Sequence, residues 1–365
     1  MREYLFTITL AALLSFLVTP FVRRIALNSG AFLQLRSRDM HKEITPRWGG
    51  IGMWFAMAVT FLIVSNLTLV GKSFGREASG IFLAGTFIMV LGALDDLYDL
   101  DSITKFAGQA LAGGILLLHG VQILWLPING IYMLPPNIGQ LLTIFFVMLV
   151  INAINFVDGL DALATGIVAI SAVAFFAFSY LLAVVNGFSR AGAPSLVTAI
   201  VIGICLGFLP HNFHPARIFM GDSGAMLLGL LLSAAAITLS GQIDINAITG
   251  SETTTLLPLL LPFAVLAIPL LDLILAIIRR LRAGRSPFAA DNEHLHHKLL
   301  EMGLSHRRTS AVLYLWTAAF AIPAVVSAFA PLWLGLLLSA LIVGLSVKLL
   351  QVKEDSPKEE RELIK

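Results

Sequence analysis

The chain is short of charge and of cysteine. Only 13% of its 365 residues are charged, whereas 58% are hydrophobic and the mean hydropathy is +0.88. Soluble domains carry about 25% charged residues, so this composition excludes a water-soluble globular fold. The net charge of +2 gives no support for a nucleic-acid partner. The single cysteine, Cys205, cannot form an internal disulfide and is interpreted as a packed thiol.

The apolar residues come instead in runs of about 20, the length of helix that crosses a hydrocarbon core. In lipid, such runs satisfy their backbone polar groups as helices. A transmembrane barrel would show alternating segments of about 10 residues, which this sequence lacks. The sequence therefore predicts an all-α, polytopic integral membrane protein of about eleven spans. These are expected at residues 3–26, 49–70, 79–97, 104–122, 138–156, 162–186, 195–212, 223–241, 256–279, 309–329 and 331–350.

The sequence predicts a single transmembrane domain over residues 1–350 and a charged tail over 351–365. The first run is too long for a signal-peptide core, so we expect it to be retained as a helix. Basic residues set the orientation, because short cytoplasmic loops are enriched in Lys and Arg. They concentrate in segments 23–47 and 279–308, whereas the alternate loops hold few. The N-terminus is therefore expected outside and the C-terminus in the cytoplasm.

Residues that could carry chemistry all fall on the predicted cytoplasmic side. They occur at the ends of the third and fifth spans, between the seventh and eighth, and after the ninth. They are Asp95, Asp96, Asn152, Asn155, Asp158, Asp161, Asn212, Asp222, His294, His296 and His297. The orientation used only basic residues, so this agreement is an independent observation. It predicts one polar site at one face of the membrane.

Asp95 and Asp96 are adjacent carboxylates at a helix end, which are costly to hold together unless a cation neutralises them or one is protonated. They indicate a Mg²⁺ or proton-accepting site, with solvated loop acidity as the alternative. Asn152, Asn155 and Asp158 follow at a spacing of three and share a helix face. Their amides and carboxylate suit a phosphate, a sugar or a hard cation, although a turn also uses Asn and Asp.

Asp222 supports two interpretations, which are compatible. It could cap a helix, or it could bind Mg²⁺ beside a diphosphate at the helix N-terminus. The histidines have a spacing that predicts a loop or irregular turn. A zinc site usually needs four ligands and no cysteine is near, so with Arg285 they favour phosphate binding. Lys42, in the first basic loop, is either a lipid-phosphate contact or a topological charge.

Four motifs occur in a fixed order: DDLYDL, NAINFVDGLDALATG, NFHPARIFMGDSG and HLHH. Together they resemble the polyprenyl-phosphate N-acetylhexosamine-1-phosphate transferases of glycosyltransferase family 4. The HLHH form and the TPRWGG segment are more similar to the N-acetylglucosamine branch than to the phospho-N-acetylmuramoyl-pentapeptide transferase branch, which is the alternative.

The resemblance implies transfer of a phospho-sugar from a UDP-N-acetylhexosamine to polyprenyl (undecaprenyl) phosphate. The products are a polyprenyl-diphosphate sugar and UMP. It further implies a Mg²⁺ cofactor, with Mn²⁺ as a substitute, and an active site on the cytoplasmic face of a bacterial inner membrane. The product would initiate a cell-envelope glycan such as lipopolysaccharide or teichoic acid.

The resemblance also implies roles for individual residues. Asp222, together with Asn155, is the implied metal site, and Asp95 is the implied base, with Asp96 and Asp158 completing the catalytic set. The implied or inferred substrate contacts are Asn152, Asp161, Asn212, His294, His296, His297, Arg285 and Lys42. One departure is Ala162, which stands where the family's DGLDGLA pattern has glycine and is expected to be tolerated because both are small.

A transporter is the competing class. Transporters place charges near mid-membrane, whereas here Asp272 is the main such residue and is interpreted as a polar contact between helices. Lipid, neighbouring helices or a second copy in a homodimer could cover the apolar helix faces, and composition does not distinguish them.

Overall fold

The computed structural model describes residues 1–31, 45–73, 75–126, 132–185, 192–241, 261–286 and 294–351. Eight of its helices are long and apolar enough to cross a membrane: α1 (Arg2–Ser29), α3 (Arg76–Tyr98), α5 (Pro136–Val157), α6 (Leu163–Val185), α7 (Gly192–Asn212), α8 (Gly221–Gly241), α12 (His306–Phe329) and α13 (Leu332–Gln351). The prediction of an all-α polytopic membrane protein is confirmed.

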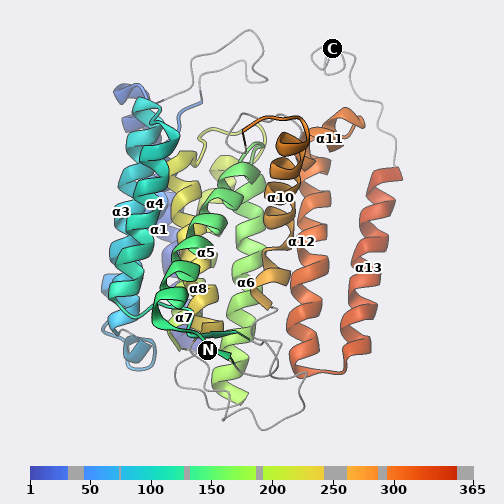
Figure 1. The fold of residues 1–365 in the computed structure, drawn as a ribbon. Coiled ribbons are helices and arrows are strands. Elements are labelled where there is room, and N and C mark those ends of the chain that lie inside the picture. The colour runs from blue at the N-terminus through green and yellow to red at the C-terminus, as the bar shows by residue number, and fades with distance from the viewer. Residues whose placement is uncertain are drawn as a thin grey trace.

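The remaining described elements are shorter. They are α2 (Gly49–Val64), η1 (Val70–Ser73), α4 (Ser102–Leu118), the strand pair β1 (Trp125–Leu126) and β2 (Tyr132–Met133), α10 (Ala267–Arg282) and α11 (Leu295–Glu301). Each predicted span overlaps one described helix, and for span 256–279 this helix is α10. The long helices run roughly parallel from one end of the molecule to the other (Figure 1).

α8 lies at the centre of the bundle and is almost entirely buried, whereas α13 is mostly exposed. α8 packs against α2, α3, α5 and α7. Glycine permits the closest of these approaches: a Cβ on Gly50 would collide with the backbone of Gly224, and one on Gly92 with the backbone of Asp222. The Gly50 N–H also donates to the Met220 carbonyl at 2.9 Å. The first turn of α8 is thereby wedged between α2 and α3.

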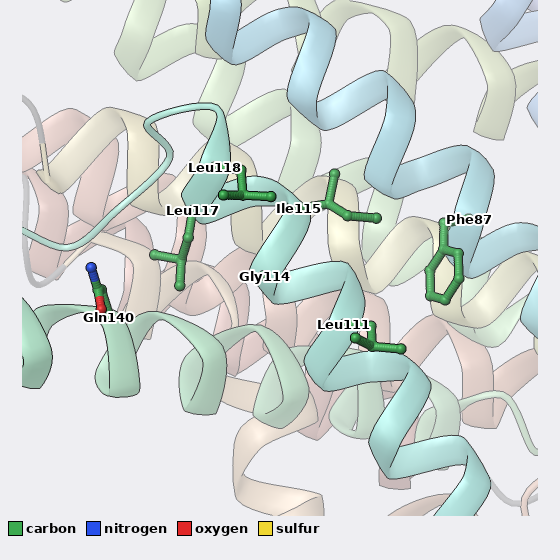
Figure 2. Close-up of a pocket in the computed structure, with 7 residues that line it drawn as sticks. All are labelled: Phe87, Leu111, Gly114, Ile115, Leu117, Leu118 and Gln140. Atoms are coloured by element: carbon green, nitrogen blue, oxygen red, sulfur yellow. The ribbon is translucent and has the colours of Figure 1, made fainter.

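An apolar hollow of about 580 Å³ crosses the outer face of α4 between α3 and α5 (Figure 2). Gly114 lies at its floor, and a Cβ there would meet open space. Its walls come from three helices: Phe87, Leu111, Ile115, Leu117, Leu118 and Gln140. Leu111 and Leu118 are among the most exposed leucines of the chain, as expected of side chains that face lipid.

The loop between α5 and α6 contains a strained residue. Ala162 has a φ of +62°, in the left-handed region that favours glycine. Its N–H donates to Asn212 Oδ1 and its carbonyl accepts from the Tyr314 hydroxyl, so the conformation is held from both sides. The residue type at position 162 is therefore constrained by the backbone conformation rather than by the size of the side chain.

We expect Ala162→Gly to stabilise the protein by about 0.5–1 kcal/mol. Glycine removes a left-handed penalty of roughly 1–2 kcal/mol and adds unfolded-state entropy that offsets part of the gain. Thermal unfolding in detergent measures the change. Ala164→Gly, in the first turn of α6, is the matched control and should lower the midpoint. Equal effects of the two substitutions would contradict the assignment of strain to residue 162.

Candidate active site

The polar motifs meet at one end of the helix bundle. The last turns of α3 and α5 lie there with the first turns of α4 and α8, and α11 lies beside them (Figure 1). Asp95 and Asp96 belong to the last turn of α3, Asp158 directly follows α5, and Asp222 is in the first turn of α8. The arrangement agrees with the prediction that these residues share one face.

Asp96 caps α8 from a different helix. Its carboxylate accepts the backbone N–H of Asp222 at 2.9 Å and that of Ser223 at 3.2 Å. Gly221 permits this approach, because its φ is +68° and a Cβ there would collide with the Asp96 carboxylate. The cap predicted for the Asp222 side chain is thus supplied by Asp96, and the Asp222 carboxylate makes other contacts.

Lys105 of α4 lies between two of the carboxylates. Its Nζ is 2.5 Å from Asp95 Oδ2 and 3.3 Å from Asp222 Oδ2. Asn155 donates to the other Asp222 oxygen at 3.1 Å, and the other Asp95 oxygen accepts the Leu100 N–H. The Asp95 side chain is 2% exposed, whereas those of Lys105 and Asp222 are 26% and 28% exposed. We call this arrangement the Asp95–Lys105–Asp222 cluster; only its Lys105 and Asp222 ends reach the surface.

Asp158 lies close to this cluster. Burial raises the pKa of its carboxyl group well above the usual value, and the charges of Asp222 and Asp96 raise the pKa further. The Arg47 guanidinium opposes this shift. A carboxyl group with a raised pKa is a stronger base once it is ionised. In its ionised form, Asp158 is therefore a candidate proton acceptor.

Asn152 pairs with a second helix below the cluster. Its amide donates to Gln109 Oε1 of α4 at 2.7 Å and to the Met148 carbonyl at 2.7 Å. Gln109 is buried. These bonds fix α5 against α4, and so fix Asn155 relative to Lys105.

Asp161 and Asn212 hold the loop after α5 against the loop before α8. The Asp161 carboxylate accepts from His214 Nδ1 at 2.7 Å and from the Ala216 N–H at 3.1 Å. Asn212 accepts from the Ala162 N–H and donates to the Ile218 carbonyl. Both residues are buried. The described contacts of Asp161 and Asn212 are thus structural ones within the protein.

The histidine motif packs against the turn that carries Asp158. His294 Nδ1 is 3.0 Å from Asp272 Oδ2, and its ring stacks on Phe156 with centroids 5.4 Å apart. The His296 ring is buried against Gly159, where a Cβ would collide with it. Burial, and then His297, lower the pKa of His296 to about 3, so this ring is neutral at physiological pH. The predicted loop is wrong for His296 and His297, which lie in the first turn of α11.

Two predicted contacts lie away from this constellation. Arg285 is exposed beyond the end of α10, and its N–H donates to the Arg280 carbonyl. Lys42 lies outside the described residues.

Comparison with known proteins identifies the family. Residues 78–240, from α3 to α8, match the family described as Glycosyl transferase family 4. The decaprenyl-phosphate N-acetylglucosaminephosphotransferase of Mycolicibacterium smegmatis is 43% identical over 337 residues, which cover 90% of this chain and 83% of the relative. The chain belongs to glycosyl transferase family 4. It is therefore a transferase that resides in the membrane.

Two more distant relatives of the family carry related names. The probable undecaprenyl-phosphate N-acetylglucosaminyl 1-phosphate transferase of Bacillus subtilis is 32% identical over 90% of this chain and 86% of its own length. The undecaprenyl-phosphate alpha-N-acetylglucosaminyl 1-phosphate transferase of Escherichia coli K12 is 29% identical over 87% and 83%. The resemblance to the N-acetylglucosamine branch of the family is thus confirmed.

The Asp95–Lys105–Asp222 cluster contains a residue that the sequence motifs do not mark, Lys105. Lys105 falls inside predicted span 104–122, whereas the basic residues that indicate the orientation lie in loops. A lone lysine one turn into an otherwise apolar helix, nine residues after Asp96, was the available signal. Arg47 was noted only as part of TPRWGG, although its charge acts on Asp158.

The residues at the surface end of the cluster offer few oxygen ligands for Mg²⁺. Asp222 and Asn155 supply hard oxygen donors, but within the described part of the chain no three His, Cys, Asp or Glu residues are arranged to hold a metal. Mg²⁺ is commonly bound by one or two carboxylates together with substrate phosphates and water. The residues present fit a Mg²⁺ that binds together with a diphosphate.

Proposed function

We propose that the protein transfers N-acetylglucosamine-1-phosphate from UDP-N-acetylglucosamine to polyprenyl phosphate, releasing UMP. The named activities of relatives at 29–43% identity support this assignment. The observation that carries it is the Asp95–Lys105–Asp222 cluster, which combines carboxylates and a cation at the end of membrane-spanning helices. A lipid phosphate anchored in the bilayer and a soluble nucleotide can meet at that position.

The proposed site faces the cytoplasm of a bacterial cell, in the inner membrane. The C-terminal part of α1, the last turn of α10 and the first turn of α12 carry basic residues of segments 23–47 and 279–308, and these helix ends lie at the same end of the bundle as the cluster (Figure 1). Short cytoplasmic loops are enriched in basic residues. The prenyl chain of the acceptor can lie against the apolar surface of α4. The hollow on that helix begins at Leu111, about 9 Å along the helix axis from Lys105.

In the proposed reaction, an oxygen of the lipid phosphate attacks the β-phosphorus of the UDP-sugar. The bond from that phosphorus to the bridging oxygen breaks, and UMP leaves with the oxygen. A phosphate monoester has a second pKa of about 6, so most of the acceptor is already dianionic at pH 7. Charge neutralisation and alignment therefore contribute more than proton removal.

The cluster's residues have distinct proposed roles. Lys105 offsets repulsion between the two substrates' phosphates, and Asp96 keeps the α8 N-terminus in place. Both Asp95 oxygens are engaged, by Lys105 and by the Leu100 N–H, so Asp95 positions the lysine. Asp158 then takes the remaining proton of a monoanionic acceptor. Asp222 and Asn155 would hold Mg²⁺, which would neutralise diphosphate charge when bound.

The function is tested with purified protein, Mg²⁺, polyprenyl phosphate and a panel of UDP-sugars. The expected result is UMP release with UDP-N-acetylglucosamine that depends on the lipid. Release only with UDP-N-acetylmuramoyl-pentapeptide would select the alternative branch, and no release with any sugar would exclude the transferase assignment.

Removal of divalent metal should stop turnover. We expect excess chelator to abolish UMP release and added Mg²⁺ or Mn²⁺ to restore it, because two anionic substrates repel each other without a cation. The far-UV circular dichroism spectrum, recorded in parallel, should stay unchanged. Undiminished turnover in chelator would contradict the metal proposal.

A further inference from the structure

Asp272 is a buried carboxylate within α10, in the apolar part of the bundle. Its side chain is 2% exposed. Ionisable residues at such depth are costly and need partners. Oδ2 accepts from His294 Nδ1 at 3.0 Å, and Oδ1 accepts from the Leu295 N–H at 3.0 Å. Each oxygen therefore has one donor.

The bond from the Leu295 N–H anchors the start of α11, but the fold alone does not require the bond from His294. His294 is the N-cap residue of α11, and its side chain makes no capping bond. A serine or aspartate at position 294 would cap the helix locally, and an apolar residue at 272 would pack without desolvating a charge. The chain instead has a histidine turned toward a carboxylate from another helix.

The surroundings of His294 connect it to the Asp95–Lys105–Asp222 cluster. Its ring stacks on Phe156, and the Arg280 guanidinium lies 5.1 Å from the same Phe156 ring centroid. Phe156 directly follows Asn155, whose amide donates to Asp222. His294 is therefore held against the last turn of α5, one residue from an Asp222 contact.

We propose that Asp272 is a positioning residue for the transfer reaction, acting through His294. A carboxylate only accepts hydrogen bonds, so it fixes the proton on Nδ1 and leaves Nε2 as the ring atom that can meet the substrate. The same principle orients histidines in hydrolase triads and metal sites, where an acidic partner sets the tautomer. The inference rests on the proposed function.

Asp272→Asn separates this role from packing. The carboxamide has the same shape but a single acceptor oxygen, while His294 and Leu295 each present a donor. If the amide oxygen stays on the Leu295 N–H, its NH₂ faces Nδ1. His294 can then bond only as an acceptor, with its proton moved to Nε2.

The test combines histidine NMR with kinetics. In ¹⁵N-histidine-labelled protein in detergent, Asp272→Asn should change one ring from the Nδ1–H to the Nε2–H tautomer, the signal being assigned by its loss in His294→Gln. The kcat for UMP release should fall about 10- to 100-fold. Asp101→Asn is the control: Asp101 caps α4 from the surface, Asn also caps, and both readouts should stay unchanged.

A double variant shows whether Asp272 acts through His294. Asp272→Asn combined with His294→Gln should be no slower than His294→Gln alone, because the two act as one unit. Additive losses, an unchanged tautomer, or wild-type kcat in Asp272→Asn would each overturn the proposal. If wild-type protein releases no UMP, the proposed function fails, while the tautomer measurement still decides whether Asp272 sets the ring.

Discussion

Asp222→Asn should lower the rate of UMP release by about 10²- to 10³-fold. Asp222 is the carboxylate of the Asp95–Lys105–Asp222 cluster that reaches the surface, and it contacts both Lys105 and Asn155. Asparagine keeps the shape and removes the charge, so Lys105 loses one partner and the proposed Mg²⁺ loses one ligand. The fold should persist, because α8 is capped by Asp96 and not by the Asp222 side chain.

Steady-state kinetics across a Mg²⁺ titration measure this effect. We expect the variant to need more Mg²⁺ and to remain slow at saturation. Asp99→Asn is the matched control, because Asp99 is exposed, ends α3 in a left-handed conformation that asparagine tolerates, and should retain wild-type rates. Near-normal turnover of Asp222→Asn would remove the metal-ligand assignment.

Lys105→Gln should cost about 10²-fold or more in kcat, for a different reason. The substitution removes the ammonium group that lies between Asp95 and Asp222. It also leaves the buried Asp95 carboxylate without its ion-pair partner, which destabilises the fold. The loss of activity and the loss of stability therefore have to be separated.

The double variant Asp95→Asn with Lys105→Gln separates them. Removing both charges relieves the unpaired carboxylate, so the unfolding midpoint should recover toward wild type. Activity should not recover, because the substrates' phosphates still lack the ammonium group. Recovery of activity in the double variant would mean that Lys105 serves only to neutralise Asp95.

The helical fold and the shared face of the polar motifs were predictable from sequence, because both depend on local patterns. A run of about 20 apolar residues determines a span wherever the helix packs, and alternating loops decide on which side Asp95, Asp158 and Asp222 fall. One prediction from local spacing was wrong. The spacing of His296 and His297 predicts a loop, but both lie in the first turn of α11, whose helix is anchored by Asp272 from a separate segment.

Roles that depend on distant partners were not predictable from single motifs. Asp96 caps a helix that begins more than a hundred residues later. Lys105 contacts Asp95 and Asp222 only because α4 packs beside the end of α3 and the start of α8. Asn152 and Asn212 look like substrate contacts by residue type, yet their described bonds fix one segment to another. Sequence shows that a residue is polar and near the interface, and packing decides what it touches.

The most direct test of the central claim follows the β-phosphorus of the donor. UDP-N-acetylglucosamine labelled with ³²P at the β-position is incubated with protein, Mg²⁺ and polyprenyl phosphate, and the products are separated into lipid and aqueous fractions. The proposed reaction moves the label into the lipid fraction and releases unlabelled UMP. Label that remains with the nucleotide as UDP, while the sugar enters the lipid, would contradict it.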